Sequence, residues 1–210
     1  MTERLLSRPC ASAFTAACTS AGIAATLYAA TVSAQTAPSY PVRPVRIVVG
    51  FAPGGGTDIM ARFFAQKLSE TTGQTFVVEN RAGAGSNIGN DFVAKASPDG
   101  YTLLMAIQSL TINVSLYSKL TYDAVKDFAP ISTVAVTPNC FAVHPSLPVK
   151  TIRDLIALAK TRPGEIAYAS PGSGTPVHLS MELFRSMAGI KLLHIPYNGA
   201  GPATTAVLGG

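Results

Sequence analysis

Residues 45–58 read Val-Arg-Ile-Val-Val-Gly-Phe-Ala-Pro-Gly-Gly-Gly-Thr-Asp, and this stretch decides the fold class. The β-branched residues of 45–49 predict a buried strand that ends at a glycine. The Gly- and Pro-rich residues that follow predict a loop. Residues 58–72 then carry apolar side chains at three- and four-residue spacings, which predicts a helix ending at Gly73. We expect Thr57 or Asp58 to cap the start of this helix.

The same order of strand and helix recurs along the chain. Further strands are predicted at 75–79, 101–107, 166–169 and 191–195, and further helices at 86–96, from a capping box at 151–154 to Pro163, at 176–188, and from near Pro202. This alternation predicts an α/β fold with parallel sheets. Residues 108–127 lack a regular pattern. Two apolar runs, 131–136 and 141–143, are interpreted as a crossing between two lobes, and Cys140 as a small apolar residue of a strand.

Three loops share one design, in which a strand runs through Gly, Pro and hydroxyl residues directly into a helix. They are residues 51–58, 170–176 and 196–202. Glycine allows backbone amides to approach a ligand closely, and a helix start offers unpaired N–H groups and partial positive charge. The helix dipole contributes only about 0.3 to 1 kcal/mol per helix, so several loops would have to converge on one anion. A single loop of this kind is usually an ordinary tight turn, but three at corresponding positions favour a carboxylate or phosphate site.

Other kinds of site fit the sequence poorly. The first loop lacks the Gly-Lys-Ser/Thr ending of a nucleotide-binding loop, and the glycines of 83–89 have the wrong spacing for a dinucleotide. Ser173 and His178 lack the surrounding pattern of a hydrolase. An enzyme using Asp58 or His178 is the weakest reading, because a carboxylate at a helix start is more often a cap. We therefore predict no enzyme, no cofactor and no metal, and the scattered basic residues predict no nucleic-acid partner.

The N-terminus has the pattern of a signal peptide. Arg4 and Arg8 precede an Ala-rich apolar run at 11–30, and small residues lead to Ala34. Cleavage near Ala34 would lower the formal net charge from +5 to +4, because two positive charges and one negative charge are lost. It would also leave Cys140 as the one cysteine. We therefore expect residues 1–34 to be removed on export to the periplasm.

Four stretches together resemble the Bug family, the substrate receptors of tripartite tricarboxylate transporters. They are FAPGGGTDIMAR at 51–62, VVENRAGAGSNIGNDFVAKASPDGYTLL at 77–104, YASPGSGTPVHLSMELF at 168–184 and HIPYNGAGPATTAVLGG at 194–210. The resemblance implies a two-lobed, type II periplasmic-binding-protein-like fold that closes about a hinge on a small carboxylate. It implies a first lobe at 35–133 and a second at 134–210, both partial, because family members continue beyond Gly210. The expected protein is a monomer that delivers its ligand to membrane subunits.

The resemblance also implies which residues bind. The first loop would contribute Phe51, Pro53, Gly54, Gly55, Thr57 and Asp58; the second Gly172, Ser173, Gly174, Thr175 and His178; and the third Tyr197, Asn198, Gly199 and Pro202. The family usually has an acidic residue where this chain has Ala206, and small residues with a His where it has 107–110. These differences leave open whether the ligand is a di- or tricarboxylate, an aromatic acid or an acidic amino acid.

Two alternatives to a transport receptor remain open from the sequence. The unfinished second lobe is consistent with a truncated relic that binds nothing. The resemblance also permits a protein that presents its ligand to a sensor kinase.

Overall fold

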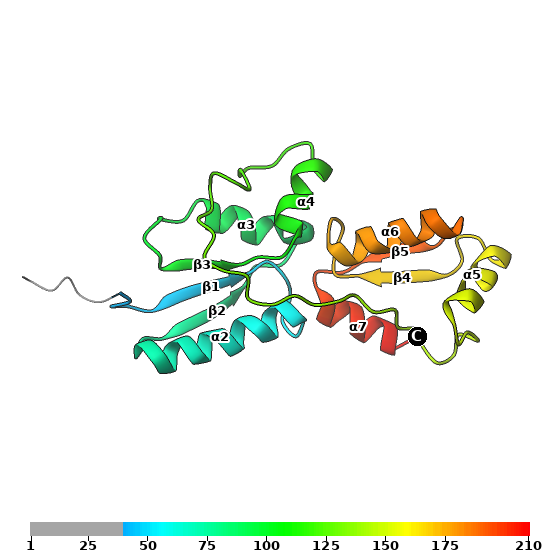
Figure 1. The fold of residues 1–210 in the computed structure, drawn as a ribbon, viewed down its shortest axis with the longest axis horizontal. Helices are drawn as coiled ribbons and strands as arrows, with labels where there is room; N and C mark the ends of the chain where they lie inside the picture. The colour runs from blue at the N-terminus through cyan, green and yellow to red at the C-terminus, as the bar shows by residue number, and fades with distance from the viewer. Residues whose placement is uncertain (1–39) are drawn as a thin grey trace, which may run out of the picture. The chain divides into compact units, whose positions relative to one another are not determined.

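The computed structural model describes residues 40–210, so the predicted signal peptide at 1–34 lies outside the described residues. Two parallel sheets with flanking helices form the described fold (Figure 1). In chain order the elements are β1 (Val45–Val49), α2 (Gly56–Thr72), β2 (Phe76–Asn80), the 3-10 helix η1 (Ala84–Ser86), α3 (Asn87–Ala94), β3 (Thr102–Met105), α4 (Ser109–Leu116), α5 (Ile152–Thr161), β4 (Ala167–Ser170), α6 (Pro176–Ala188), β5 (Leu193–Pro196) and α7 (Ala200–Leu208).

The first sheet has three parallel strands in the order β2-β1-β3. Helices α2 and α3 lie on opposite sides of it, so the central strand β1 is covered on both faces (Figure 1). Val45, Val48 and Val49 of that strand have no exposed surface. On the α2 side, Ile47 and Val49 belong to one apolar core with Ala61 of the helix. The continuous apolar run of 45–49 is therefore explained by burial on both faces.

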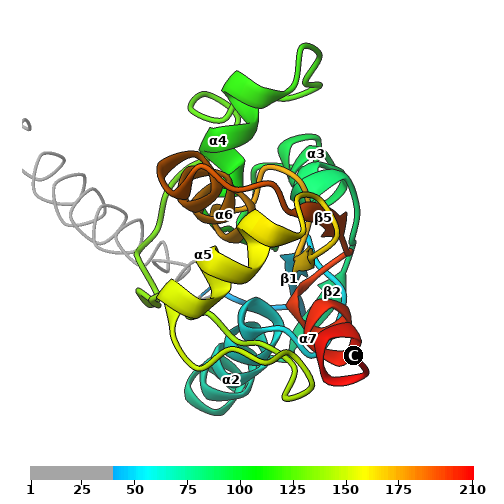
Figure 2. The ribbon, with the colours of Figure 1, turned by 90° about the vertical axis from the view of Figure 1, so that its right-hand side faces the viewer.

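The second sheet pairs β4 and β5 in parallel, with α6 and α7 on opposite sides (Figure 1). Figure 2 views this sheet from the side of α5. Its core contains Ala159 from α5, Tyr168 from β4, and Ile190 and Leu192 from the segment that enters β5. The sheet thus has a core of its own.

The predicted helix boundaries agree with the structure where a cap or a glycine marks them. Helix α6 spans 176–188 as predicted and ends at Gly189, which has a left-handed φ of 60°. The capping box at the start of α5 is confirmed, since Asp154 N donates to Thr151 Oγ1 over 3.1 Å and Asp154 accepts from the Thr151 amide. The cap predicted for α2 was wrong. The helix starts two residues earlier, its N-cap is Gly55, and neither Thr57 nor Asp58 caps it.

The stretch between the two sheets differs from the prediction. Helix α4 forms inside the region that showed no pattern, and between Tyr117 and Thr151 the structure describes no helix or strand. Cys140 is exposed in this segment, so its placement in a strand was wrong. A strand needs a hydrogen-bonded neighbour, and no described strand pairs with residues 131–143. The lobe boundary at 133/134 stays a prediction.

Within residues 40–210, none of the helices combines the length and the apolar character that a membrane span requires.

Candidate functional site

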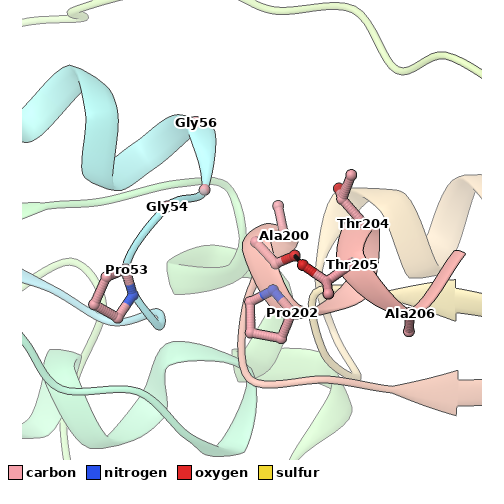
Figure 3. Close-up of a pocket in the computed structure, with 10 residues that line it drawn as sticks. Pro53, Gly54, Gly56, Ala200, Pro202, Thr204, Thr205 and Ala206 are labelled. Atoms are coloured by element: carbon pink, nitrogen blue, oxygen red, sulfur yellow. Dashed lines mark hydrogen bonds between the residues drawn. The ribbon is translucent and has the colours of Figure 1, made fainter. Parts of the chain in front are cut away.

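The first and third loops open onto one cavity of about 830 Å³. Figure 3 shows Pro53, Gly54 and Gly56 on one side and Ala200, Pro202 and Thr204 on the other. The lining residues are Pro53, Gly54, Gly55, Gly56, Ala200, Gly201, Pro202, Thr204, Thr205 and Ala206. The loops follow β1 and β5, which belong to different sheets, and the carboxyl ends of both strands lead to helix starts that line this cavity.

Backbone contacts hold these two loops together. The Ala52 amide donates to the Asn198 carbonyl over 2.7 Å. A β-carbon on Gly201 would lie 2.7 Å from the Pro53 carbonyl oxygen, and one on Gly55 would lie 3.3 Å from the Ala200 β-carbon. Gly201 is therefore required for the close approach of the chains, since larger residues there would push the loops apart.

The cavity is suited to an anion. Helix α2 starts after Gly55 and helix α7 after Gly199, and neither N-cap residue makes a side-chain capping hydrogen bond. The first amides of each helix have no partner within the helix, and each start carries partial positive charge. No Lys or Arg is among the residues that line this cavity. The site thus offers backbone amides and the Thr204 hydroxyl, without a fixed cation, while the Thr205 hydroxyl donates to the Gly201 carbonyl over 3.2 Å.

Asp58 braces the first loop. Its carboxylate is 3% exposed and accepts hydrogen bonds from the Gly54 amide (3.0 Å), Asn80 Nδ2 (2.9 Å) and Arg62 Nε (3.0 Å). Burial on its own would raise the pKa of Asp58, but the hydrogen bonds from Arg62, Gly54 and Asn80 lower it below its ordinary value. Asp58 is not among the residues lining the cavity, so its observed role is to hold the loop in shape.

The second loop is fixed by its own side chains. Thr175 is fully buried, and its hydroxyl donates to the Gly172 carbonyl over 2.7 Å and accepts from the His178 amide over 3.4 Å at the start of α6. Ser170 Oγ accepts from the Gly172 amide over 3.2 Å. The loop also lies close to the third loop, because a β-carbon on Gly172 would be 3.3 Å from the Tyr197 carbonyl oxygen.

Beside the second loop, three rings form a stack of Tyr168, His194 and His178. The ring centroids of Tyr168 and His194 are 4.8 Å apart and those of His194 and His178 are 4.3 Å apart. His178 Nδ1 accepts from the Gly174 amide over 3.3 Å, so this ring contacts the loop directly. The His178 side chain is only 16% exposed, so most of this ring is covered.

Charged groups surround this stack. Glu182 accepts from Tyr168 Oη over 2.5 Å and from Arg185 over 2.5 Å, and it lies 3.9 Å from His178 Nε2. The hydrogen bond from Tyr168 outweighs the burial of Glu182 and, with Arg185, lowers the pKa of this carboxyl. Burial raises the pKa of Tyr168. Burial and the neighbouring His178 lower the pKa of His194 below 6.5, while Glu182 opposes that shift and Arg185 adds to it.

We expect His194 to make the fold less stable in weak acid. A folded-state pKa below the unfolded value means that the stability is fully present above about pH 6.5 and falls as the pH drops below it. Melting temperatures recorded between pH 7.5 and 5 should therefore fall less steeply in His194→Gln than in the wild type. His144→Gln, outside the stack, is the control and should keep the wild-type slope. Equal slopes for wild type and His194→Gln would contradict the expectation.

The structure brings together only part of the residue set that the resemblance implies. Pro53, Gly54, Gly55 and Pro202 line the cavity. Elsewhere, Phe51 lies in the core of the first sheet, Thr57 is half-buried on α2, Tyr197 is half-buried, and Asn198 and Gly199 contact Ala52. No residue of the second loop is among the cavity-lining residues. Ligand binding by the whole set stays a prediction.

Six lining residues were missing from the predicted set: Gly56, Ala200, Gly201, Thr204, Thr205 and Ala206. The first three lie within the predicted loops, and the last three follow Pro202 within the first turns of α7. The predicted helix start near Pro202 was the available signal, because residues within a turn of a helix start can share its face. Among residues 40–210, no group of three or more His, Cys, Asp or Glu side chains is placed to hold a metal ion.

Comparison with known proteins identifies the family. Residues 60–210 match the sequence model of the tripartite tricarboxylate transporter family receptor, called TctC. The chain belongs to this family. Protein BugT of Bordetella pertussis (strain Tohama I) is 45% identical to this TctC chain over 184 residues, which are 87% of the chain and 56% of BugT. The predicted resemblance to Bug receptors is confirmed.

Solved structures of periplasmic binding proteins share the fold of this TctC receptor chain. Rpa4515 of R. palustris, solved with adipate, has a TM-score of 0.79 and 40% identity over 81% of this chain and 57% of its own. MatC of Rhodopseudomonas palustris, with bound malate, has a TM-score of 0.74 and 31% identity over 81% and 58%. The periplasmic binding protein BugD has a TM-score of 0.71 at 35% identity, over 81% of this chain and 57% of its own.

These structures confirm the predicted α/β, two-lobed periplasmic-binding-protein fold. The TctC receptor chain spans a little over half the length of the relatives it matches.

Proposed function

We propose that this chain is a periplasmic receptor that captures a small carboxylate, a dicarboxylate in the first instance, and delivers it to the membrane subunits of a tripartite tricarboxylate transporter. The observation that carries the proposal is the cavity where the uncapped starts of α2 and α7 face each other. Its amides and the Thr204 hydroxyl suit a carboxylate, because charge-assisted hydrogen bonds from several donors can replace a fixed cation.

The comparisons support the carboxylate class. Rpa4515 was solved with adipate and MatC with malate, and both share the fold and more than 30% of the aligned sequence. The residues that line the cavity here carry no charge, so the ligand's carboxylate would lie against neutral donors. In this family setting, closure of the second loop toward the cavity would complete the enclosure of the ligand.

The direct test is thermal melting of the 210-residue chain with adipate, malate, citrate, benzoate and glutamate at constant ionic strength. An acid that binds the native state raises the melting temperature, and at a hundred times its dissociation constant it adds about 2.7 kcal/mol of stability. Dimethyl adipate, which lacks the charges, is the ligand control and should not shift the melt. A cooperative melt that none of the acids moves would contradict the proposal and favour a chain that does not bind.

Two variants of α7 test where the acid binds. Thr204→Asp places a carboxylate on the cavity wall, where it should repel an anionic ligand and abolish the shift in melting temperature. Leu208→Asp places the same group at the far end of the helix, at a residue that is 73% exposed and does not line the cavity. Its shift should match the wild type. If the acid shifts the melting temperature of both variants by the same amount, it binds elsewhere.

A further inference from the structure

The second loop touches the first-sheet side of the fold at two glycines. A β-carbon on Gly85 would lie 2.2 Å from the Ser173 carbonyl oxygen. A β-carbon on Gly174 would lie 2.2 Å from Asn113 Oδ1 and 2.9 Å from Leu116 Cδ2. Both glycines have left-handed φ values, 62° for Gly85 and 80° for Gly174. The Gly85 backbone therefore lies against the Ser173 backbone, and the Gly174 backbone lies against the Asn113 and Leu116 side chains, more closely than a side chain on either glycine would permit.

The side chain of Asn113 has a fixed orientation at this contact. It is fully buried, and its Nδ2 donates to the Gly85 carbonyl over 3.0 Å and to Asn87 Oδ1 over 2.7 Å. A carbonyl can only accept, so the NH₂ group must face Gly85. The Asn113 Oδ1 atom is left facing Gly174, and among the described residues it has no hydrogen-bond donor.

The surroundings hold Asn113 in place. Tyr122 Oη also donates to Asn87 Oδ1 over 2.7 Å, and Asn90 Nδ2 donates to Tyr122 Oη over 3.1 Å. Asn90 is 1% exposed and donates to Ser86 Oγ, next to Gly85 in the chain. These hydrogen-bonded side chains adjoin the contact. They limit its movement, because each of them has at least one hydrogen-bond partner.

We propose that Gly85, Asn113, Ser173 and Gly174 form a latch that positions the second loop when the two sheets close on a ligand. The inference rests on the proposed function, because the second loop is one of the three loops that the family resemblance assigns to ligand binding. Closing the latch removes water from Asn113 Oδ1 without supplying a donor other than the weak Cα–H of Gly174. The latch is therefore only partly closed in the free protein, and a bound ligand shifts it toward closure by adding favourable contacts.

Two glycine variants with the same backbone conformation test the latch. Gly85→Ala adds a methyl group against Ser173 at φ 62° and ψ 35°, and Gly189→Ala adds one in open space at φ 60° and ψ 41°. The conformational strain should be the same in both, so any difference reports the contact. Hydrogen exchange of the amides of 172–178, measured without ligand, should be about tenfold faster in Gly85→Ala than in Gly189→Ala. Equal exchange in the two variants overturns the latch.

The affinity for a ligand provides a second test of the latch. The dissociation constant for adipate or malate, measured by calorimetry, should rise about tenfold in Gly85→Ala and stay at the wild-type value in Gly189→Ala. Gly85 lies outside the three loops to which binding is assigned, so a weaker affinity there reports positioning. If the wild type binds neither acid, the proposed function fails while the exchange comparison still decides the latch.

A second substitution, Asn113→Ala, distinguishes the contact at Gly174 from the contact at Gly85. Asn113→Ala removes Oδ1, the nearer of the two side-chain atoms that a β-carbon on Gly174 would strike. The other, Leu116 Cδ2, is the end of a flexible side chain that can move, so the change should slow the exchange of Gly174→Ala back toward the wild type. It should not rescue Gly85→Ala, because the Ser173 backbone carbonyl is unaffected by that change. Gly164→Ala, with φ 84° and open space around it, is the control for Gly174→Ala. Rescue of both variants, or of neither, contradicts the proposed contact.

Discussion

Replacing Asp58 with Asn is expected to lower the free energy of unfolding by about 2 to 3 kcal/mol. The variant keeps the shape of the side chain but turns one acceptor oxygen into a donor. That donor would face the Arg62 guanidinium or Asn80 Nδ2, both of which donate to Asp58 in the wild type. Losing hydrogen bonds to a buried charged acceptor costs about 1.5 to 3 kcal/mol. Urea unfolding measures the difference.

A second carboxylate on the same helix is the control for Asp58. Glu70 is half exposed and pairs with Lys67 on the surface of α2. Glu70→Gln should cost much less than Asp58→Asn, because exposed ion pairs contribute little to stability. A cost for Asp58→Asn no larger than that of Glu70→Gln would show that the buried brace contributes little.

The stability that Asp58 contributes is expected to be lost in acid. Because its folded-state pKa is lowered, the stability that its charge contributes is present above about pH 3.8 and is lost as the pH falls through the folded-state pKa. Asp58→Asn should therefore lose less stability than the wild type when the pH is lowered past 3.8. Urea unfolding of the wild type and of Asp58→Asn, at pH 7 and below pH 3.8, measures this difference in lost stability.

Replacing Gly50 with Ala is expected to cost about 2 to 3 kcal/mol. A β-carbon at this position would lie 2.6 Å from the Ser86 β-carbon and 3.1 Å from the Ser86 carbonyl oxygen. Ser86 cannot easily move, because its hydroxyl is buried against Ser109 at 2.8 Å and accepts from Asn90. Overpacking a rigid contact usually costs 1 to 3 kcal/mol and sometimes more.

Gly56 provides the matched comparison for Gly50. It lies in the same strand-to-helix connection, and a β-carbon there would meet no atom within 4 Å. Neither glycine has a left-handed φ, so backbone strain does not distinguish them. Gly56→Ala should leave stability unchanged or raise it by about 0.4 to 1 kcal/mol through the unfolded chain. Thermal melts that rank the two alanine variants equally would mean that the contact at Ser86 can relax.

The sequence was sufficient for elements whose signals are local. Helix α6 could be bounded from Pro176 and Gly189 because an N-terminal Pro and a left-handed Gly act within one turn. The family could likewise be identified from short motifs, each confined to one strand and the loop after it. Such features need no knowledge of which segments meet in space.

Helix α4 could not be predicted because, within the irregular stretch 108–127, residues 109–116 lack the spacing of an amphipathic helix. Apolar residues occupy every second position of 109–116, at Leu110, Ile112, Val114 and Leu116. The structure buries Ser109 and Asn113 instead, and leaves Val114 about half exposed. Contacts with residues 85–90 decide this orientation, since Ser109 and Asn113 bond to Ser86, Gly85 and Asn87. Long-range polar contacts therefore override the local period.

The role of Asp58 was hidden for the same reason. Its position suggested a helix cap, but Asn80, which accounts for one of its contacts, lies 22 residues later in the chain. The cavity lining was also only partly predictable, because the facing of α7 toward the first loop depends on the close approach of Gly201 to Pro53. Nothing in either local sequence specifies the other partner.

The order of strands in the two sheets has a consequence for how the protein folds. Strands β1, β2 and β3 are consecutive in the chain, and so are β4 and β5, so neither sheet borrows a strand from the other. The hydrogen bonds among β1, β2 and β3 involve no residue after 105, so they do not depend on β4 or β5. Each group of described strands can therefore pair without the other, which reduces the unpaired strand edges that a folding chain exposes to aggregation.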